Sequence, residues 1–131
     1  MAKTEIQTDD APSPVAAFAQ GVRKGNVVQV AGQVGIDPAT GQVAGTSVAV
    51  QARRTLTNLA AVLAAGGATL DDVVMMRVYL TDTAHFAELN EVYGEFMRGH
   101  VTEPFPARTT VYVGLPQGLL VEIDALAVLD Q

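Results

Sequence analysis

Two kinds of ionisable side chain near the end of the chain have the types and spacing that proton-transfer chemistry requires. Glu122 and Asp124 interrupt the otherwise apolar segment 119–128, and Arg108 begins a strand-like segment shortly before it. Since alternate residues of a strand face the same way, Glu122 and Asp124 share one face with apolar neighbours. A carboxylate in such surroundings has a raised pKa, which suits proton transfer near neutral pH. An amphipathic strand with both acids in water is the open alternative.

If the last two predicted strands form a hairpin, Arg108 and Glu122 can lie close together on one face of a sheet, although the sequence does not fix the register. Strands predicted at residues 107–114 and 119–128 flank the turn Leu115-Pro116-Gln117-Gly118, and they would pair as a hairpin. The planar guanidinium of an arginine fits a carboxylate with two parallel hydrogen bonds. A simple Arg108–Glu122 salt bridge across the strands is the competing interpretation, because such pairs are common.

Most other kinds of catalytic site lack the residues that they need. The chain contains no cysteine, which excludes disulfides, Cys-ligated zinc, iron–sulfur clusters and thiol nucleophiles. His85 and His100 do not have the spacing of metal ligands, so we predict no metal site. The glycines match neither a dinucleotide-binding GxGxxG motif nor a phosphate-binding loop, and neither serine lies in a GxSxG motif.

Charge and hydropathy narrow the classes of partner. The net charge is −6, with two lysines and six arginines, and such a chain repels the phosphate backbone of nucleic acids. No run approaches the roughly 18 apolar residues that would cross a bilayer, and the N-terminus has no apolar signal core. We therefore expect a cytoplasmic protein that binds neither nucleic acid nor membrane.

The chain has 131 residues, of which 49% are hydrophobic and 17% charged. These values fit one domain over residues 1–131, and we expect residues 1–10 to be irregular. The predicted order of elements is ββαβαββ. They are strands at 16–22 and 26–33, a helix that starts after Thr46 or Ser47 and ends at Gly66-Gly67, a strand at 73–80, a helix at about 84–98, and strands at 107–114 and 119–128.

These elements predict an α+β fold, in which a mixed sheet carries both helices on one face. Several strands are nevertheless apolar on both faces, as the runs Val27-Val28 and Val73-Val74-Met75-Met76 illustrate. Since a large apolar surface is not stable in water, we expect the second face of the sheet to be buried against other subunits.

The chain resembles the YjgF/RidA (reactive intermediate deaminase) family over about residues 10–128. The segments that carry the resemblance are Gln20-Gly21-Val22, Ala31-Gly32-Gln33 with Asp37-Pro38-x-Thr40-Gly41, Asn90-x-x-Tyr93, Phe105-Pro106-Ala107-Arg108 and Val121-Glu122-Ile123-Asp124-Ala125. The last two together are the most specific. The resemblance implies a chorismate-mutase-like fold of the bacillus type, assembled as a homotrimer with sites in the clefts between subunits.

The resemblance also implies an activity that needs no cofactor. It is the hydrolysis of enamine and imine intermediates, such as 2-aminoacrylate and 2-iminopropionate, to a 2-oxo acid and ammonia. By analogy, Arg108 would clamp the substrate carboxylate, and Glu122 would orient or activate the attacking water and shuttle protons. The other residues that the resemblance assigns to substrate binding are Phe18, Ala31, Asn90 and Thr110.

Three departures from the family pattern mark the chain as a divergent member. Phe18 stands where the tyrosine of a Gly-Pro-Tyr sequence is usual, and Ala31 replaces a frequent serine. Thr109-Thr110 follows the arginine, where Ser or Cys and another residue are usual. The first two changes remove polar groups and imply a drier pocket. Two other functions stay open, a non-catalytic trimer that binds small carboxylates and a ribonuclease or translation inhibitor, and the net charge of −6 disfavours the latter.

Overall fold

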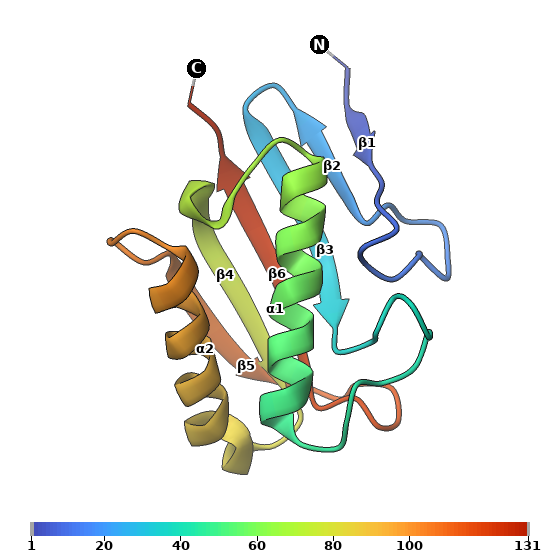
Figure 1. The fold of residues 1–131 in the computed structure, drawn as a ribbon, viewed down its shortest axis with the longest axis vertical. Helices are drawn as coiled ribbons and strands as arrows, with labels where there is room; N and C mark the ends of the chain where they lie inside the picture. Colours follow the sequence, from blue (N-terminus) through green and yellow to red (C-terminus); the bar gives the residue numbers. More distant parts are fainter. Residues whose placement is uncertain (1, 131) are drawn as a thin grey trace.

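Six strands form one mixed sheet, and both long helices pack on the same face of it (Figure 1). The computed structural model describes residues 2–130. Its strands are β1 (Thr4–Ile6), β2 (Gly21–Lys24), β3 (Val27–Val34), β4 (Val73–Leu80), β5 (Ala107–Tyr112) and β6 (Val121–Val128), and its helices are α1 (Val48–Ala65) and α2 (Phe86–His100), with 3-10 turns η1 (Leu70–Asp72) and η2 (Thr83–His85). The order across the sheet is β1-β2-β3-β6-β4-β5. The predicted α+β fold, with two helices on one face of a mixed sheet, is confirmed.

The N-terminal part of the prediction needs two corrections. Residues 4–6 form β1, which pairs antiparallel with β2, so the segment 1–10 is not irregular throughout. Its anchor is Ile6, whose side chain is 3% exposed. The predicted strand at 16–22 is reduced to β2, because residues 16–20 are irregular, with the amide of Phe18 donating to the carbonyl of Ala16.

The predicted hairpin between residues 107–114 and 119–128 is wrong. β5 pairs with β4 in parallel, with Met76 beside Arg108, whereas β6 lies between β3 and β4 and is antiparallel to both. β6 takes this central position because its inward-facing side chains are almost completely buried, as at Ile123 and Ala125. β5 has only one neighbour and stays at the edge of the sheet. β4 therefore separates the strand of Arg108 from the strand of Glu122.

Buried amide side chains connect α1 to the loops around it. Ser47 caps the helix, since its Oγ accepts from the amide of Val50, and Gly66 ends it. Gln51 is fully buried; its Nε2 donates to the carbonyls of Gly45 and Gly118, and its Oε1 accepts from the amide of Leu120. One side chain thus holds the loop before α1 and the segment that enters β6.

No helix within residues 2–130 is long and apolar enough to cross a membrane.

Replacing Gln51 by leucine is expected to lower the free energy of unfolding by about 2–4 kcal/mol, because two carbonyls and one amide lose their buried partner. Urea unfolding followed by circular dichroism measures the change. Gln42→Leu is the matched control: its side chain is exposed, and a change within about 0.5 kcal/mol is expected. Equal losses in both variants would contradict the role given to Gln51.

Candidate functional site

The guanidinium of Arg108 lies on the face of the sheet that the helices cover. Arg108 sits beside Met76, whose side chain is fully buried, and neighbouring residues in register point to the same face. Its Nη2 donates to Oδ1 of Asn90 on α2 at 2.6 Å, and its Nε donates to Oγ1 of Thr110 at 2.9 Å. Both polar partners were predicted as site residues, and the structure brings them together with Arg108.

Two aromatic rings of α2 complete the surroundings of the guanidinium. The Cζ atom of Arg108 lies 4.7 Å from the ring centroid of Tyr93 and 5.8 Å from that of Phe86. Phe86, Asn90 and Tyr93 fall on one side of the helix because they are spaced by four and three residues. The ring of Tyr93 is held by packing, since its buried hydroxyl has no hydrogen-bond partner within residues 2–130.

These contacts leave the charge of Arg108 without a counter-ion among its neighbours, which are an amide, a hydroxyl and two rings. Burial lowers the pKa of Arg108 from its ordinary value, and the nearby Tyr93 and Tyr112 side chains oppose the shift. A guanidinium nevertheless stays protonated in proteins. A half-buried cation with neutral partners and fixed orientation is suited to receive a small anion, and its planar shape favours a carboxylate.

Glu122 lies on the opposite face of the sheet, which no helix covers. Its strand neighbours in register are Tyr79 on β4 and Val34 on β3. Its carboxylate lies against the backbone of Gly32, because a Cβ atom added to Gly32 would stand 2.7 Å from Oε2 of Glu122. Only glycine leaves this space free, so the absence of a side chain at residue 32 sets where the carboxylate rests.

The two acids of β6 have different surroundings. Asp124 accepts hydrogen bonds from Nε of Arg77 at 2.7 Å and from the hydroxyl of Tyr79 at 2.8 Å, so its charge is compensated. Burial raises the pKa of the Glu122 carboxyl above its ordinary value, and the negative charge of Asp124 raises it further. The structure therefore separates a fixed, paired carboxylate from one whose proton affinity is increased, which is the property that a proton shuttle requires.

Phe18 and Ala31 lie on the Glu122 side of the molecule. Phe18 and Gly32 line one hollow of about 130 Å³, and the ring of Phe18 is 53% exposed. Ala31 precedes Gly32 in the chain, and its amide donates to the carbonyl of Gln20. The predicted site residues thus form two groups on opposite faces, the first around Arg108 and the second around Glu122.

The sequence prediction gave no role to Gly32, Tyr93, Phe86 or the Arg77–Asp124 pair. For Tyr93 and Phe86, the spacing of three and four residues from Asn90 was the available signal. No sequence signal identifies the contact between Gly32 and Glu122, because it depends on the register of β3 against β6.

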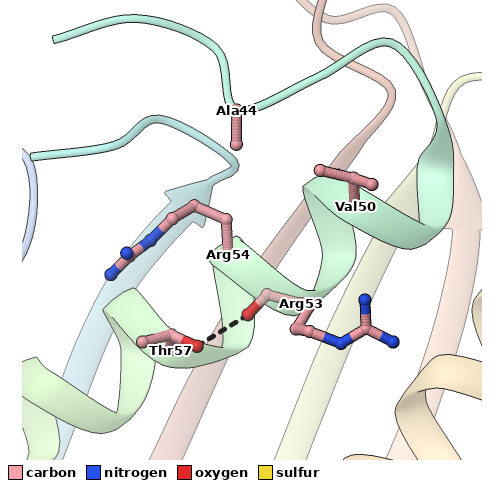
Figure 2. Close-up of a pocket in the computed structure, with 5 residues that line it drawn as sticks. All are labelled: Ala44, Val50, Arg53, Arg54 and Thr57. Atoms are coloured by element: carbon pink, nitrogen blue, oxygen red, sulfur yellow. Dashed lines mark hydrogen bonds between the residues drawn. The ribbon is translucent and has the colours of Figure 1, made fainter. Parts of the chain in front are cut away.

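A larger hollow, of about 300 Å³, lies on the outer surface of α1 and is lined by Ala44, Val50, Arg53, Arg54 and Thr57 (Figure 2). The side chains of Arg53 and Arg54 point away from each other, and the hydroxyl of Thr57 donates to the carbonyl of Arg53 at 2.8 Å. None of the predicted site residues lines this hollow, and it contains no acid for proton transfer. The candidate site residues therefore lie on the sheet and α2, away from this hollow.

Known proteins with this sequence pattern share its whole length. Residues 8–129 match the family model described as Endoribonuclease L-PSP. A RutC family protein of Pyrococcus abyssi is 42% identical over 128 residues, which cover 97% of this chain and 98% of that protein. The chain belongs to the YjgF/RidA family. Another relative in this family, the 2-iminobutanoate/2-iminopropanoate deaminase of Escherichia coli K12, is 40% identical over 129 residues, covering 98% of both chains.

Solved structures of YjgF/RidA proteins have the same fold. The YjgF gene product of E. coli superposes with a TM-score of 0.90 at 38% identity, over 95% of this chain and 98% of that one. E. coli TdcF with bound serine gives a TM-score of 0.92 at 37% identity, over 97% of this chain and 99% of that one.

Glu122→Gln is expected to leave the free energy of unfolding at pH 8 unchanged or higher. A carboxyl whose pKa is raised by folding adds stability below its unfolded pKa, and that stability is lost as pH rises through the folded pKa. The amide variant carries no such loss, so the difference from the wild type should shrink at pH 4. Urea unfolding at both pH values measures this.

Asp124→Asn provides the comparison, because it removes the charge that Arg77 and the Tyr79 hydroxyl contact. A loss of about 1–2 kcal/mol is expected for this variant at pH 8. A similar loss in Glu122→Gln would mean that Glu122 is a structural acid.

Proposed function

We propose that this protein hydrolyses imine and enamine intermediates of small amino acids to 2-oxo acids and ammonia. The observation that carries the proposal is the guanidinium of Arg108, a half-buried cation held by the neutral side chains of Asn90 and Thr110. This guanidinium can bind a substrate carboxylate through a charged pair of hydrogen bonds. The 40% identity to the E. coli 2-iminobutanoate/2-iminopropanoate deaminase supports the same reaction.

In this proposal Glu122 moves the protons. The imine enters protonated from solvent, and the Glu122 carboxylate accepts a proton from water as the water oxygen bonds to the imine carbon, which gives the tetrahedral carbinolamine. The Glu122 carboxyl then gives this proton to the carbinolamine nitrogen, and the C–N bond breaks with its electron pair leaving on ammonia. As the C=O bond forms, the Glu122 carboxylate takes the hydroxyl proton and returns it to solvent. An enamine first takes a proton at its β carbon to become the imine. Because an imine already reacts with water, positioning and proton transfer are sufficient for catalysis.

The proposed active site includes residues of two subunits of a homotrimer. The imine carbon of a 2-imino acid is bonded directly to its carboxylate carbon. In one chain, Arg108 and Glu122 lie on opposite faces with β4 between their strands, which are about 10 Å apart at the usual strand spacing. One substrate therefore reaches both residues only if Arg108 of one subunit faces Glu122 of the next.

The uncovered face of the sheet supports this assembly. Val27, Val111 and Val128 point to that face and are 42%, 40% and 39% exposed. Such apolar side chains on an open sheet are typical of a surface that another subunit covers.

A non-catalytic trimer that binds small carboxylates is the second candidate. It is favoured by the bound serine in E. coli TdcF and by the lack of hydroxyl groups at Phe18 and Ala31. Such a protein would be stabilised thermally by 2-oxo acids but would release no ammonia. RNA cleavage, which the family model's description suggests, is disfavoured by the net charge of −6.

Wild-type protein is expected to accelerate the deamination of 2-aminoacrylate, generated in situ by a serine or cysteine lyase, above the spontaneous rate. Arg108→Ala should lower kcat/KM by about 100-fold or more, because the charged contact to the substrate carboxylate is lost. Arg98→Ala is the control, since Arg98 is an exposed arginine on α2. Ammonia release is the measurement. Absence of acceleration by folded wild-type protein would favour the binding trimer.

Mixing two inactive variants is expected to restore activity if the site spans two subunits. Arg108→Ala and Glu122→Ala chains are unfolded together in equal amounts and refolded. Random reassembly makes about three-quarters of the trimers mixed, and each mixed trimer regains one of three sites, so roughly a quarter of the wild-type activity is expected. Each variant refolded alone is the control. Mixed samples that stay inactive would mean that each subunit supplies both residues to its own site.

A further inference from the structure

An apolar pocket lies beside Gly32 of β3. Its volume is about 130 Å³, and its apolar lining consists of Pro12, Pro14, Val15, Phe18, Val34 and Ile36. Gly32 also lines it, and Gly32 is the residue against which the Glu122 carboxylate rests. The pocket and the Glu122 carboxylate therefore border the same residue, Gly32.

The wall of this pocket from the N-terminal segment is fixed by a buried glutamine. Gln20 is 3% exposed, and its Nε2 donates to the carbonyls of Thr8, Ala11 and Pro12, while its Oε1 accepts from the amide of Thr8. Pro12 and Pro14 further restrict the backbone of the same segment. The part of the wall around Pro12 is therefore formed before any ligand arrives, which reduces the entropy lost on binding.

The wall from β3 is fixed in the same way. Nδ2 of the buried Asn58 on α1 donates to the carbonyls of Val34 and Ile36 at 3.0 and 2.9 Å. The backbone at Val34 and Ile36, two of the residues that this segment contributes to the pocket, is thus attached to the helix layer.

Two of the three polar side chains that line the pocket, Gln20 and Gln33, make hydrogen bonds inside the protein, and the third, Ser13, is exposed at its edge. Gln20 uses both ends of its amide on the segment 8–12, and Nε2 of Gln33 donates to the carbonyl of Ala31 at 3.3 Å. A polar ligand side chain would lose its water here and gain few hydrogen bonds, which is costly. An apolar side chain has no hydrogen bonds to water to lose when it enters the pocket.

We propose that this pocket holds the substrate side chain, and that the protein prefers 2-imino acids with apolar side chains of about four carbons. The inference rests on the proposed function, because it places the imine carbon beside Glu122. The size follows from the volume: an engineered cavity of about 150 Å³ in another protein holds benzene. A methyl side chain leaves most of the pocket empty, and an isobutyl side chain fills it.

Three imines that share one core test the preference. An amino-acid oxidase with catalase generates them in situ from alanine, leucine and asparagine. Leucine and asparagine give side chains of equal heavy-atom number, one apolar and one an amide. We expect kcat/KM for the isobutyl imine to exceed that for the methyl imine and that for the amide imine by about tenfold or more. The 2-oxo acid formed above the uncatalysed rate is the measurement.

Two variants test whether the preference for apolar side chains arises in the pocket beside Gly32. Val34→Thr keeps the shape and adds a hydroxyl, and Val15→Ser changes a side chain that is 94% exposed, so it does not disturb folding. Each is expected to reduce the isobutyl-to-methyl ratio of kcat/KM by about threefold or more. Val50→Thr, on the outer surface of α1, is the matched control and should leave the ratio unchanged.

The outcomes separate the two proposals. No acceleration with any of the three imines would overturn the proposed function and the inference with it. Acceleration that is equal for all three, or a ratio that neither pocket variant changes, would overturn the inference alone and leave the deaminase function in place.

Discussion

The position of β6 in the middle of the sheet is the constraint on which the rest of the structure depends. Its inward-facing side chains, from Val121 to Ala127, are buried almost completely, and both of its edges carry hydrogen-bonded neighbours, β3 and β4. Because side chains alternate along a strand, burying one set directs Glu122 and Asp124 to the opposite, uncovered face. The same placement pushes β5, and Arg108 with it, to the edge beside α2.

This arrangement divides the electrostatics of the molecule between two faces. Under the helices, Arg108 keeps a positive charge among neutral partners, and two aromatic rings hold its orientation. On the other face, Asp124 is paired with Arg77, while burial raises the pKa of the Glu122 carboxyl and the negative charge of Asp124 raises it further. A cation without a charged partner and a carboxyl with a raised pKa thus exist in one chain, and a direct Arg108–Glu122 salt bridge would have removed both features.

Buried amides place the parts that strands alone do not fix. Gln51 holds the loop before α1 and the segment that enters β6, Asn58 holds the end of β3, and Gln20 holds the segment before β2. Each satisfies several backbone groups at once, so their geometry is specified closely although the segments they hold are irregular. The apolar pocket beside Gly32 is a product of two of these amides rather than of any continuous motif.

The sequence by itself determined the local features: both helices, the strand at residues 73–80, the α+β class, and the identity of Arg108, Glu122, Asn90 and Thr110 as residues of interest. These features depend on short-range periodicity and on the types of residues that lie within a few positions of one another. It placed Arg108 and Glu122 on one hairpin, and it missed β1 and the contact of Gly32 with Glu122. Only the tertiary structure decided these, because strand order and register are set by pairing between distant segments that compete to bury apolar surface, and no local pattern records which pairing wins.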